Sequence, residues 1–228
     1  MIAAYTARWA PRDDRTVIFF PPALSLTTVV RALGNRTDIA VGVQNIWTED
    51  KGAFTGESSA PMAKDAGARY VLVGHSERRH VFGETDEQTG KKCEAAVRNG
   101  LTPILCVGEL LAQRESGTTH DVVLRQLAAG VALLSAEAVA SMAIAYEPVW
   151  AIGTGKTATP DDASKVHREI RVALEKRIGH GAENIPILYG GSVTAANAKS
   201  LLEAPGVDGV LVGGACLDVD RWSVICNT

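Results

Sequence analysis

The chain has 228 residues, of which 46% are hydrophobic and 21% are charged, and its formal net charge at pH 7 is −3. This length predicts one domain with a single large core, because the chain is short for two typical domains. The small negative charge argues against a nucleic acid or an anionic membrane as a partner. It leaves room for a local phosphate pocket made of backbone N–H groups.

The predicted elements begin with a helix over Ile2 to Ala10, which ends before Pro11. Short apolar runs of strand length then recur at Val17 to Phe20, Ile39 to Val43, Tyr70 to Val73, Pro103 to Val107, Met142 to Tyr146, Pro186 to Tyr189 and Gly209 to Val212. Longer segments with helical spacing follow these runs after Leu24, after Ser58, and over Glu87 to Asn99, His120 to Ala140, Asp161 to Ile178, Ala195 to Leu202 and Val219 to Ile225. The pattern therefore predicts seven strands and eight helical segments.

This alternation indicates parallel strands joined by crossover helices that cover both faces of the sheet. Two α/β architectures fit, a doubly wound sheet and a closed (β/α)8 barrel. Residue types that are common in catalytic and anion-binding sites follow several different strands, namely Gln44-Asn45, His75, Cys106, Glu147, Gly190-Gly191 and Gly213-Gly214. That distribution favours the barrel, since a doubly wound sheet would concentrate its signal in a G-x-G-x-x-G after the first strand. Seven strands would leave a slot between the first and the last, because eight close such a barrel.

A carboxylate stands at the end of the fifth predicted strand, in Ala145-Tyr-Glu-Pro-Val-Trp-Ala-Ile-Gly-Thr-Gly-Lys-Thr-Ala158. Pro148 stiffens one hinge of the loop that follows, and Gly153 and Gly155 let the backbone approach an anion or swing as a lid. A catalytic base occupies such a position in barrel enzymes. From spacing alone, a solvated carboxylate at a strand end explains Glu147 equally well.

A histidine stands at the end of the third predicted strand, in Val73-Gly-His-Ser-Glu-Arg-Arg79. A lone histidine is more often structural than catalytic. A nearby helix N-terminus disfavours a charged imidazolium, however, so a neutral His75 ring can donate a hydrogen bond to a substrate oxygen at neutral pH.

Glycines occur at three places that suit an anion: Gly153 in the loop after Glu147, Tyr189-Gly-Gly-Ser192 and Leu211-Val-Gly-Gly-Ala215. Any one of them alone reads as a tight turn. Together they favour a phosphate site, because backbone N–H groups after the last strands of a barrel, and helices starting just beyond, point positive charge at an anion.

From about Val17 to the C-terminus these motifs resemble triosephosphate isomerase. The resemblance implies a TIM barrel over residues 1–228 that starts at its first helix and lacks its first strand. It implies that Glu147 is the proton-transfer base and that His75 is the electrophile, supported by Glu77, Arg78 and the buried thiol of Cys106. The phosphate-binding residues it implies are Gly153, Ser192, Gly213 and Gly214.

The implied reaction interconverts dihydroxyacetone phosphate and glyceraldehyde 3-phosphate through an ene-diolate, as in glycolysis and gluconeogenesis, while the loop from Val149 to Thr159 excludes water. No metal or organic cofactor is expected. The run Gly52-Ala-Phe-Thr-Gly-Glu57 is similar to an arm that the family inserts beside a partner subunit's active site. This implies a twofold homodimer with Thr55 as a contact residue.

The chain departs from the family at its front. The family's first strand carries a Gly-Asn-Trp-Lys motif, whereas this chain has neither that motif nor a lysine before Lys51. Loss of this charge is expected to lower the rate by about 10³-fold or more.

Three explanations stay open. Met1 is an internal methionine of a longer gene, or the chain is impaired or is a non-catalytic phosphate-binding relic, or it isomerises a related sugar phosphate such as an erythrulose phosphate. The lid sequence Ala-Ile-Gly-Thr-Gly-Lys favours the triose over the tetrose.

The remaining features point to a reducing compartment. Cys93, Cys106, Cys216 and Cys226 show no C-x-x-C spacing, so neither a zinc site nor a disulfide framework is expected. The N-terminus has no basic start followed by a long apolar run, and no stretch approaches the about 20 apolar residues of a membrane span. We expect a cytoplasmic protein.

Overall fold

The computed structural model describes residues 1–152, 154 and 157–228. Its strands are β1 (Val17–Phe19), β2 (Ile39–Val43), β3 (Tyr70–Val73), β4 (Thr102–Val107), β5 (Ala143–Tyr146), β6 (Ile187–Tyr189) and β7 (Gly209–Val210). They pair in chain order in one sheet, and every pairing is parallel. The strands predicted from the apolar runs are therefore confirmed, with ends that differ by at most two residues.

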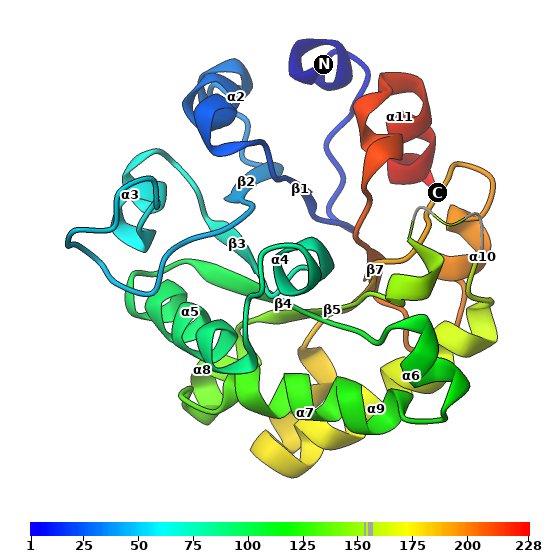
Figure 1. Cartoon of the computed structure of the whole chain (residues 1–228). Coiled ribbons are helices and arrows are strands. Elements are labelled where there is room, and N and C mark those ends of the chain that lie inside the picture. Colours follow the sequence, from blue (N-terminus) through cyan, green and yellow to red (C-terminus); the bar gives the residue numbers. More distant parts are fainter. Residues whose placement is uncertain (153, 155–156) are drawn as a thin grey trace.

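The helical segments lie before, between and after these strands (Figure 1). The α-helices are α1 (Ile2–Thr6), α2 (Leu26–Leu33), α3 (Ala60–Asp65), α4 (Ser76–His80), α5 (Asp86–Arg98), α6 (Leu111–Glu115), α7 (Thr119–Val131), α8 (Ala136–Ala140), α9 (Pro160–Ile178), α10 (Ala198–Leu202) and α11 (Val219–Asn227). The 3₁₀ turns are η1 (Ala23–Ser25), η2 (Val149–Ala151), η3 (Gly179–Asn184) and η4 (Gly214–Leu217). Within the described ranges, no helix is both long and apolar enough to cross a membrane.

The eight predicted helical segments are present, but one is divided and another ends early, and the short helices α4 and α6 lie outside all eight. The helix expected over His120 to Ala140 is two helices, because the Ser135 side chain accepts a hydrogen bond from the Ala138 N–H and caps a second helix, α8. The first helix stops at Thr6 and not at Ala10, since Arg8 N–H bonds to Tyr5 O in a tighter turn. A side-chain cap or a tight turn of this kind barely changes the spacing of apolar residues, so the apolar pattern does not predict where these helices end.

The sheet is buried on both faces. In β4, Leu105 and Val107 belong to the large core between sheet and helices, whereas Ile104 and Cys106 belong to a smaller cluster inside the curl of the sheet. The large core contains residues from Ile2 to Cys226. Figure 1 shows most helices around the outside of the curled sheet, with α4 in front of the strands, which is the arrangement of a (β/α) barrel with seven strands.

The curled sheet has two edges. Among the described residues, β1 pairs with β2 alone and β7 with β6 alone. The interior side chains near these edges, Ile18, Phe20, Leu188 and Leu211, are only half-buried. The predicted slot between the first and last strands is therefore present.

The helical layer is continuous where the sheet is not. Tyr5 of α1 is fully buried, and its ring centroid lies 5.3 Å from that of Phe19 in β1 and 6.2 Å from that of Trp222 in α11. Arg15 Nη1 donates to Cys226 O at 2.6 Å. These contacts hold α1 beside α11 (Figure 1) and join the two ends of the chain across the slot.

Candidate active site

Glu147 comes directly after β5, and its side chain is 3% exposed. Its N–H donates to Val107 O at 2.8 Å, which ties it to the end of β4. A Cβ on Gly190 would lie 2.9 Å from Glu147 Cγ, and a Cβ on Gly108 would lie 1.7 Å from Glu147 O. Glycine at both positions therefore leaves the room that the backbone and side chain of Glu147 occupy.

His75 is the N-cap of α4, just after β3, and its ring reaches Glu147. His75 Nδ1 accepts a hydrogen bond from the Glu77 N–H at 3.4 Å, and Nε2 lies 3.1 Å from Glu147 Oε1. Because Nδ1 accepts, the proton of a neutral ring is on Nε2 and points at the carboxylate. The structure thus brings together the two residues that the sequence proposed as base and electrophile, from the ends of two different strands.

Ser76 donates two hydrogen bonds to the Glu147 carboxylate. Its N–H donates to Glu147 Oε2 at 2.9 Å, and its hydroxyl donates to Oε1 at 3.3 Å. Sequence reasoning missed Ser76. The available signal is its place as the first residue of α4, where an N–H has no partner within the helix.

Burial raises the pKa of Glu147 above its ordinary value of 4.5, although His75, Ser76 and Cys106 each favour the carboxylate and oppose this effect. Cys106 is itself fully buried in the interior cluster, and burial raises the pKa of its thiol well above the ordinary value. Cys106 is therefore a protonated packing residue next to the base.

The other supporting residues differ from one another. The Glu77 side chain is exposed, and its contact with His75 is through the backbone N–H. Arg78 Nε donates to the buried Glu84 at 2.9 Å, and Lys92 Nζ donates to the same carboxylate at 2.6 Å. Burial alone would raise the pKa of Glu84, but these two cations outweigh it and lower that pKa. Glu84 is thus an ionised carboxylate, and its Oε1 also accepts a hydrogen bond from the N–H of Gly74, the residue before His75.

A second buried carboxylate, Glu109, comes just after β4 and packs against the residues on either side of Glu147. Its Oε1 accepts hydrogen bonds from Tyr146 Oη at 3.1 Å and from Trp150 Nε1 at 2.9 Å. Burial raises the pKa of Glu109. The Arg114 guanidinium lies over the Trp150 ring, 4.2 Å from its centroid, so this ring is held both by its N–H and by a cation on one face. Sequence reasoning did not single out Glu109, because its partners lie about 40 residues away.

The candidate phosphate residues lie on the other side of the site. Ser192 is half-buried after β6, and its carbonyl accepts a hydrogen bond from Asn197 Nδ2 at 2.9 Å. Gly213 and Gly214 are exposed after β7, at the start of η4. Gly153 lies outside the described residues. The helices expected to start just beyond these glycines begin later, since α10 starts at Ala198 and only the four-residue η4 follows Gly213 directly. Backbone N–H groups are therefore the main donors available here.

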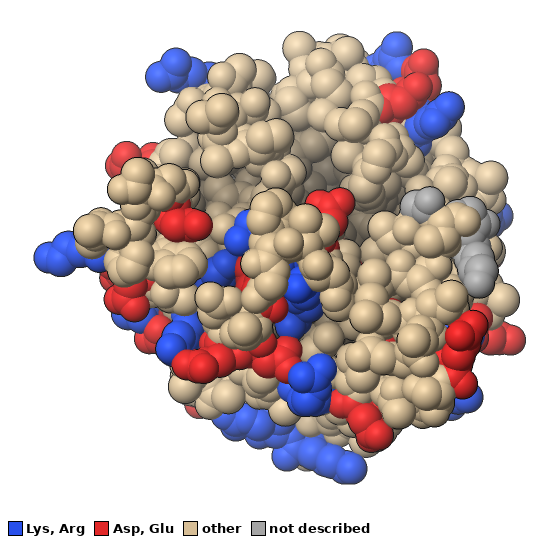
Figure 2. Space-filling model, viewed as in Figure 1, with Lys and Arg blue, Asp and Glu red and all other residues tan. Residues whose placement is uncertain are grey.

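Figure 2 shows the side of the molecule on which α4 lies, hollowed near its centre between α2, α4 and α11. Most of the charged side chains visible on this side lie below the hollow, over α4, α5 and α7. Directly above the hollow the visible side chains are mostly uncharged, and charged ones reappear farther out, near α2 and α11.

Two further predictions concern the surface and metals. Thr55 is exposed, in the loop that also holds the rings of Trp47 and Phe54, which are tilted against each other with their centroids 5.4 Å apart. In the part of the chain that the structure describes, no three His, Cys, Asp or Glu side chains are grouped so that they could hold a metal ion.

Comparison with known proteins gives consistent matches. The family model described as triosephosphate isomerase matches residues 1–228. The chain is 50% identical over 212 residues to the triosephosphate isomerase of Solibacter usitatus, covering 92% of this chain and 85% of that protein. It is 50% identical over 211 residues to that of Moorella thermoacetica, covering 92% and 84%. It is also 50% identical over 227 residues to that of Acetivibrio thermocellus, covering 99% and 90%.

Proposed function

The chain belongs to the triosephosphate isomerase family, and we propose that it interconverts dihydroxyacetone phosphate and glyceraldehyde 3-phosphate by proton transfer through an ene-diolate. One observation carries this proposal. His75 Nε2 and Glu147 Oε1 lie 3.1 Å apart at the buried ends of β3 and β5. A hydrogen-bond donor and a base that face one point suit proton abstraction next to a carbonyl.

The geometry assigns a role to each group. The Nε2–H of His75 donates its hydrogen bond to a substrate carbonyl oxygen and no longer to Glu147. Glu147 Oε1 is then free to remove a proton from the adjacent carbon. The neutral ring then stabilises the negative charge that develops on the oxygen. Glu147 returns the proton to the neighbouring carbon. The hydroxyl proton of the ene-diolate has to pass from one oxygen to the other, and His75 Nε2 can mediate this by giving its proton to one oxygen and taking the proton of the other.

Burial explains how the base is activated. Taking the carboxylate out of water raises the pKa of Glu147 and so strengthens it as a base. The loop from Val149 to Thr159, of which Gly153, Gly155 and Lys156 lie outside the described residues, is proposed to keep water out during the reaction. The phosphate of the substrate is proposed to bind at Gly153, Ser192, Gly213 and Gly214.

Phosphate binding without turnover and isomerisation of an erythrulose phosphate are the two alternatives.

The experiment compares the wild-type chain with Glu147→Asp on three- and four-carbon sugar phosphates, with glycerol 3-phosphate as an unreactive ligand in calorimetry. We expect turnover of glyceraldehyde 3-phosphate that falls in the variant, while affinity for glycerol 3-phosphate is kept. No turnover by the folded wild type, or equal loss of turnover and affinity, supports binding alone. Faster turnover of the four-carbon substrate supports the erythrulose phosphate alternative.

We also propose a twofold homodimer. Val81 and Phe82, just after α4, are 73% and 68% exposed, and Phe54 in the loop of Thr55 is 39% exposed. Exposed apolar side chains on two such segments are typical of an interface between subunits. Sedimentation of the wild type and of Phe82→Glu tests this, since a dimer is expected to dissociate in the variant.

Domain organisation and location complete the proposal. One core cluster contains residues from Ile2 to Cys226, which supports a single domain over residues 1–228. The cysteines of the structure are free, which supports a reducing compartment such as the cytoplasm.

A further inference from the structure

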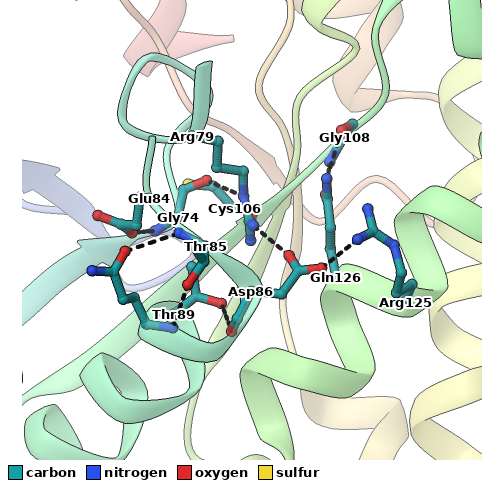
Figure 3. Close-up of polar contacts among 11 residues, drawn as sticks. Gly74, Arg79, Glu84, Thr85, Asp86, Thr89, Cys106, Gly108, Arg125 and Gln126 are labelled. Carbon is teal, nitrogen blue, oxygen red and sulfur yellow. Dashed lines mark hydrogen bonds and ion pairs between the residues drawn. The ribbon is translucent and has the colours of Figure 1, made fainter. Parts of the chain in front are cut away.

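Arg79 in α4 is a buried arginine that binds backbone carbonyls, as Figure 3 shows. Its side chain is 6% exposed. Nε donates to Gly74 O at 2.7 Å, and Nη2 donates to Cys106 O at 3.1 Å. The third nitrogen, Nη1, donates to Asp86 Oδ1 at 2.7 Å. Every nitrogen of this guanidinium therefore has a partner in a fixed direction.

The two carbonyls belong to the strand ends that carry the reactive pair. Gly74 directly precedes His75. Cys106 lies opposite Ala145 in the pairing of β4 with β5, and the next residue, Val107, accepts the N–H of Glu147 at 2.8 Å. One guanidinium thus joins the backbone next to His75 to the backbone that holds Glu147.

The Gly74 end of this link has little freedom. Gly74 has φ +72°, and a Cβ there would lie 2.6 Å from Arg79 Nη2, so the guanidinium packs directly on it. The Gly74 N–H donates to Glu84 Oε1 at 2.9 Å. The backbone N–H and C=O of Gly74 are therefore both held by buried charged side chains.

We propose that Arg79 is a positioning residue that sets the separation of His75 and Glu147 by holding the ends of β3 and β4 at a fixed spacing. The inference rests on the proposed isomerase function. The planar guanidinium presents its donors in a rigid fork, which fits two carbonyls and a carboxylate at once. A lysine ammonium is a single point charge on a flexible stem and does not reproduce that spacing.

The neighbours of Arg79 offer a matched control. Asp86 Oδ2 accepts a hydrogen bond from Arg125 Nη1 at 2.7 Å (Figure 3). Arg125 binds the same carboxylate as Arg79, but its side chain is 62% exposed and the bond to Asp86 lies on the solvent side. Arg125→Lys therefore repeats the arginine-to-lysine change on this network away from the strand ends.

The experiment measures steady-state kinetics of Arg79→Lys, Arg125→Lys and the wild type. We expect Arg79→Lys to lower kcat by about 10²-fold with little change in KM, because a misplaced reacting group weakens the transition state and not the binding of substrate. Arg125→Lys is expected to match the wild type. A folded Arg79→Lys with wild-type kcat, or with a change in KM alone, overturns the proposal.

Chemical rescue covers the case in which Arg79→Lys fails to fold at the assay temperature. Arg79→Ala is assayed at a temperature at which circular dichroism shows it folded, with millimolar methylguanidine or with methylamine. Rescue of kcat by methylguanidine and not by methylamine supports the role of the planar fork. Equal rescue by both, or by neither, overturns it.

A measurement independent of turnover separates this inference from the proposed function. The Nε2–H resonance of His75 reports its contact with Glu147 in nitrogen-15 NMR spectra. We expect Arg79→Lys to shift this resonance and Arg125→Lys to leave it in place; an unshifted resonance in Arg79→Lys overturns the proposal. A wild type without turnover refutes the proposed function, while this NMR comparison still decides the role of Arg79.

Discussion

The two sides of the site are held differently. The reactive pair lies at the ends of β3 and β5, which have a neighbouring strand on each side, and both Glu147 and Ser76 are buried there. The candidate phosphate glycines Gly213 and Gly214 follow β7, which is an edge strand, and they are exposed. The carboxyl ends of the strands in one sheet therefore form two halves of the site: a buried half after paired strands and an open half after an edge strand.

The difference shows what positions a functional side chain. Between two paired strands, a side chain is fixed by backbone bonds and by polar groups from the next strand, as Glu147 is by Val107 and Ser76. An edge strand has a neighbouring strand on one side only, so a residue that follows it can be held by a neighbouring strand from that side alone. Catalytic geometry is then expected to depend on the paired half, and binding affinity on the open half.

The largest effect is expected for removal of the base. Glu147→Gln should lower kcat by about 10²–10⁴-fold, because the amide cannot accept the substrate proton. Ser192→Ala, which removes a candidate phosphate donor after β6 and beside the open half, should raise KM and leave kcat nearly unchanged. Steady-state kinetics with glyceraldehyde 3-phosphate test both, with circular dichroism to show that each variant folds. Similar losses of kcat in the two variants would remove the distinction between the halves.

Core truncations compare the packing of the two halves. Leu105 in β4 is fully buried and packs where Gly130 has no side chain, whereas Leu211 beside β7 is half-buried. Leu105→Ala should lower the free energy of unfolding by about 2–5 kcal/mol. Leu211→Ala should lower it by about 1 kcal/mol. Urea unfolding measures the difference, and equal losses would show that the edge is packed as tightly as the centre.

Glycine substitutions test the same contrast sterically. Gly190→Ala places a Cβ 2.9 Å from Glu147 Cγ, so the base must shift and kcat should fall by about tenfold or more. Gly214→Ala meets nothing within 4 Å and is expected to keep both stability and kcat. Kinetics and thermal melts of the pair check this. Wild-type kcat in Gly190→Ala would show that the position of Glu147 is not constrained from β6.

The smallest effect is a shift in pH dependence. Burial raises the pKa of Glu147, so the acidic limb of kcat/KM should have its midpoint above the ordinary value of 4.5. A pH–rate profile of the wild type measures this midpoint, and a limb at or below 4.5 would contradict the buried position of the base.

The same shift has a consequence for stability. The folded state binds the Glu147 proton more tightly than the unfolded state does, so this group lowers stability as pH rises from 4.5 through its raised pKa. Above that range the loss is complete, and Glu147→Gln should then be at least as stable as the wild type. Melting temperatures of both proteins across this range provide the control.

Much of the fold was predictable because its signals are local. Seven apolar runs identified the strands, since a strand buried on both faces is apolar at nearly every position. The helical segments were predicted from apolar residues at helical spacing, which is also a local signal, but the positions at which a segment breaks were not predicted. Ser135 divides one of them through a single side-chain cap, which leaves the apolar period on both sides unchanged.

The candidate site was predictable in part. Glu147 and His75 stand at strand ends, and a barrel gathers strand ends at one face. Ser76, Arg79 and Glu109 were not among the predicted site residues, because each contacts a residue far away in sequence. The hydrogen bonds of Ser76 to Glu147, for example, join residues 71 positions apart.

The amino-acid sequence by itself determined the order of strands and helices, the family, and the residue types available for catalysis and phosphate binding, because each follows from short patterns along the chain. Only the tertiary structure decided the 3.1 Å contact of His75 with Glu147, the burial that raises the pKa of the base, and the covering of the slot by α1 and α11. Distances and burial arise when separate strands and helices pack together, and no local pattern contains them.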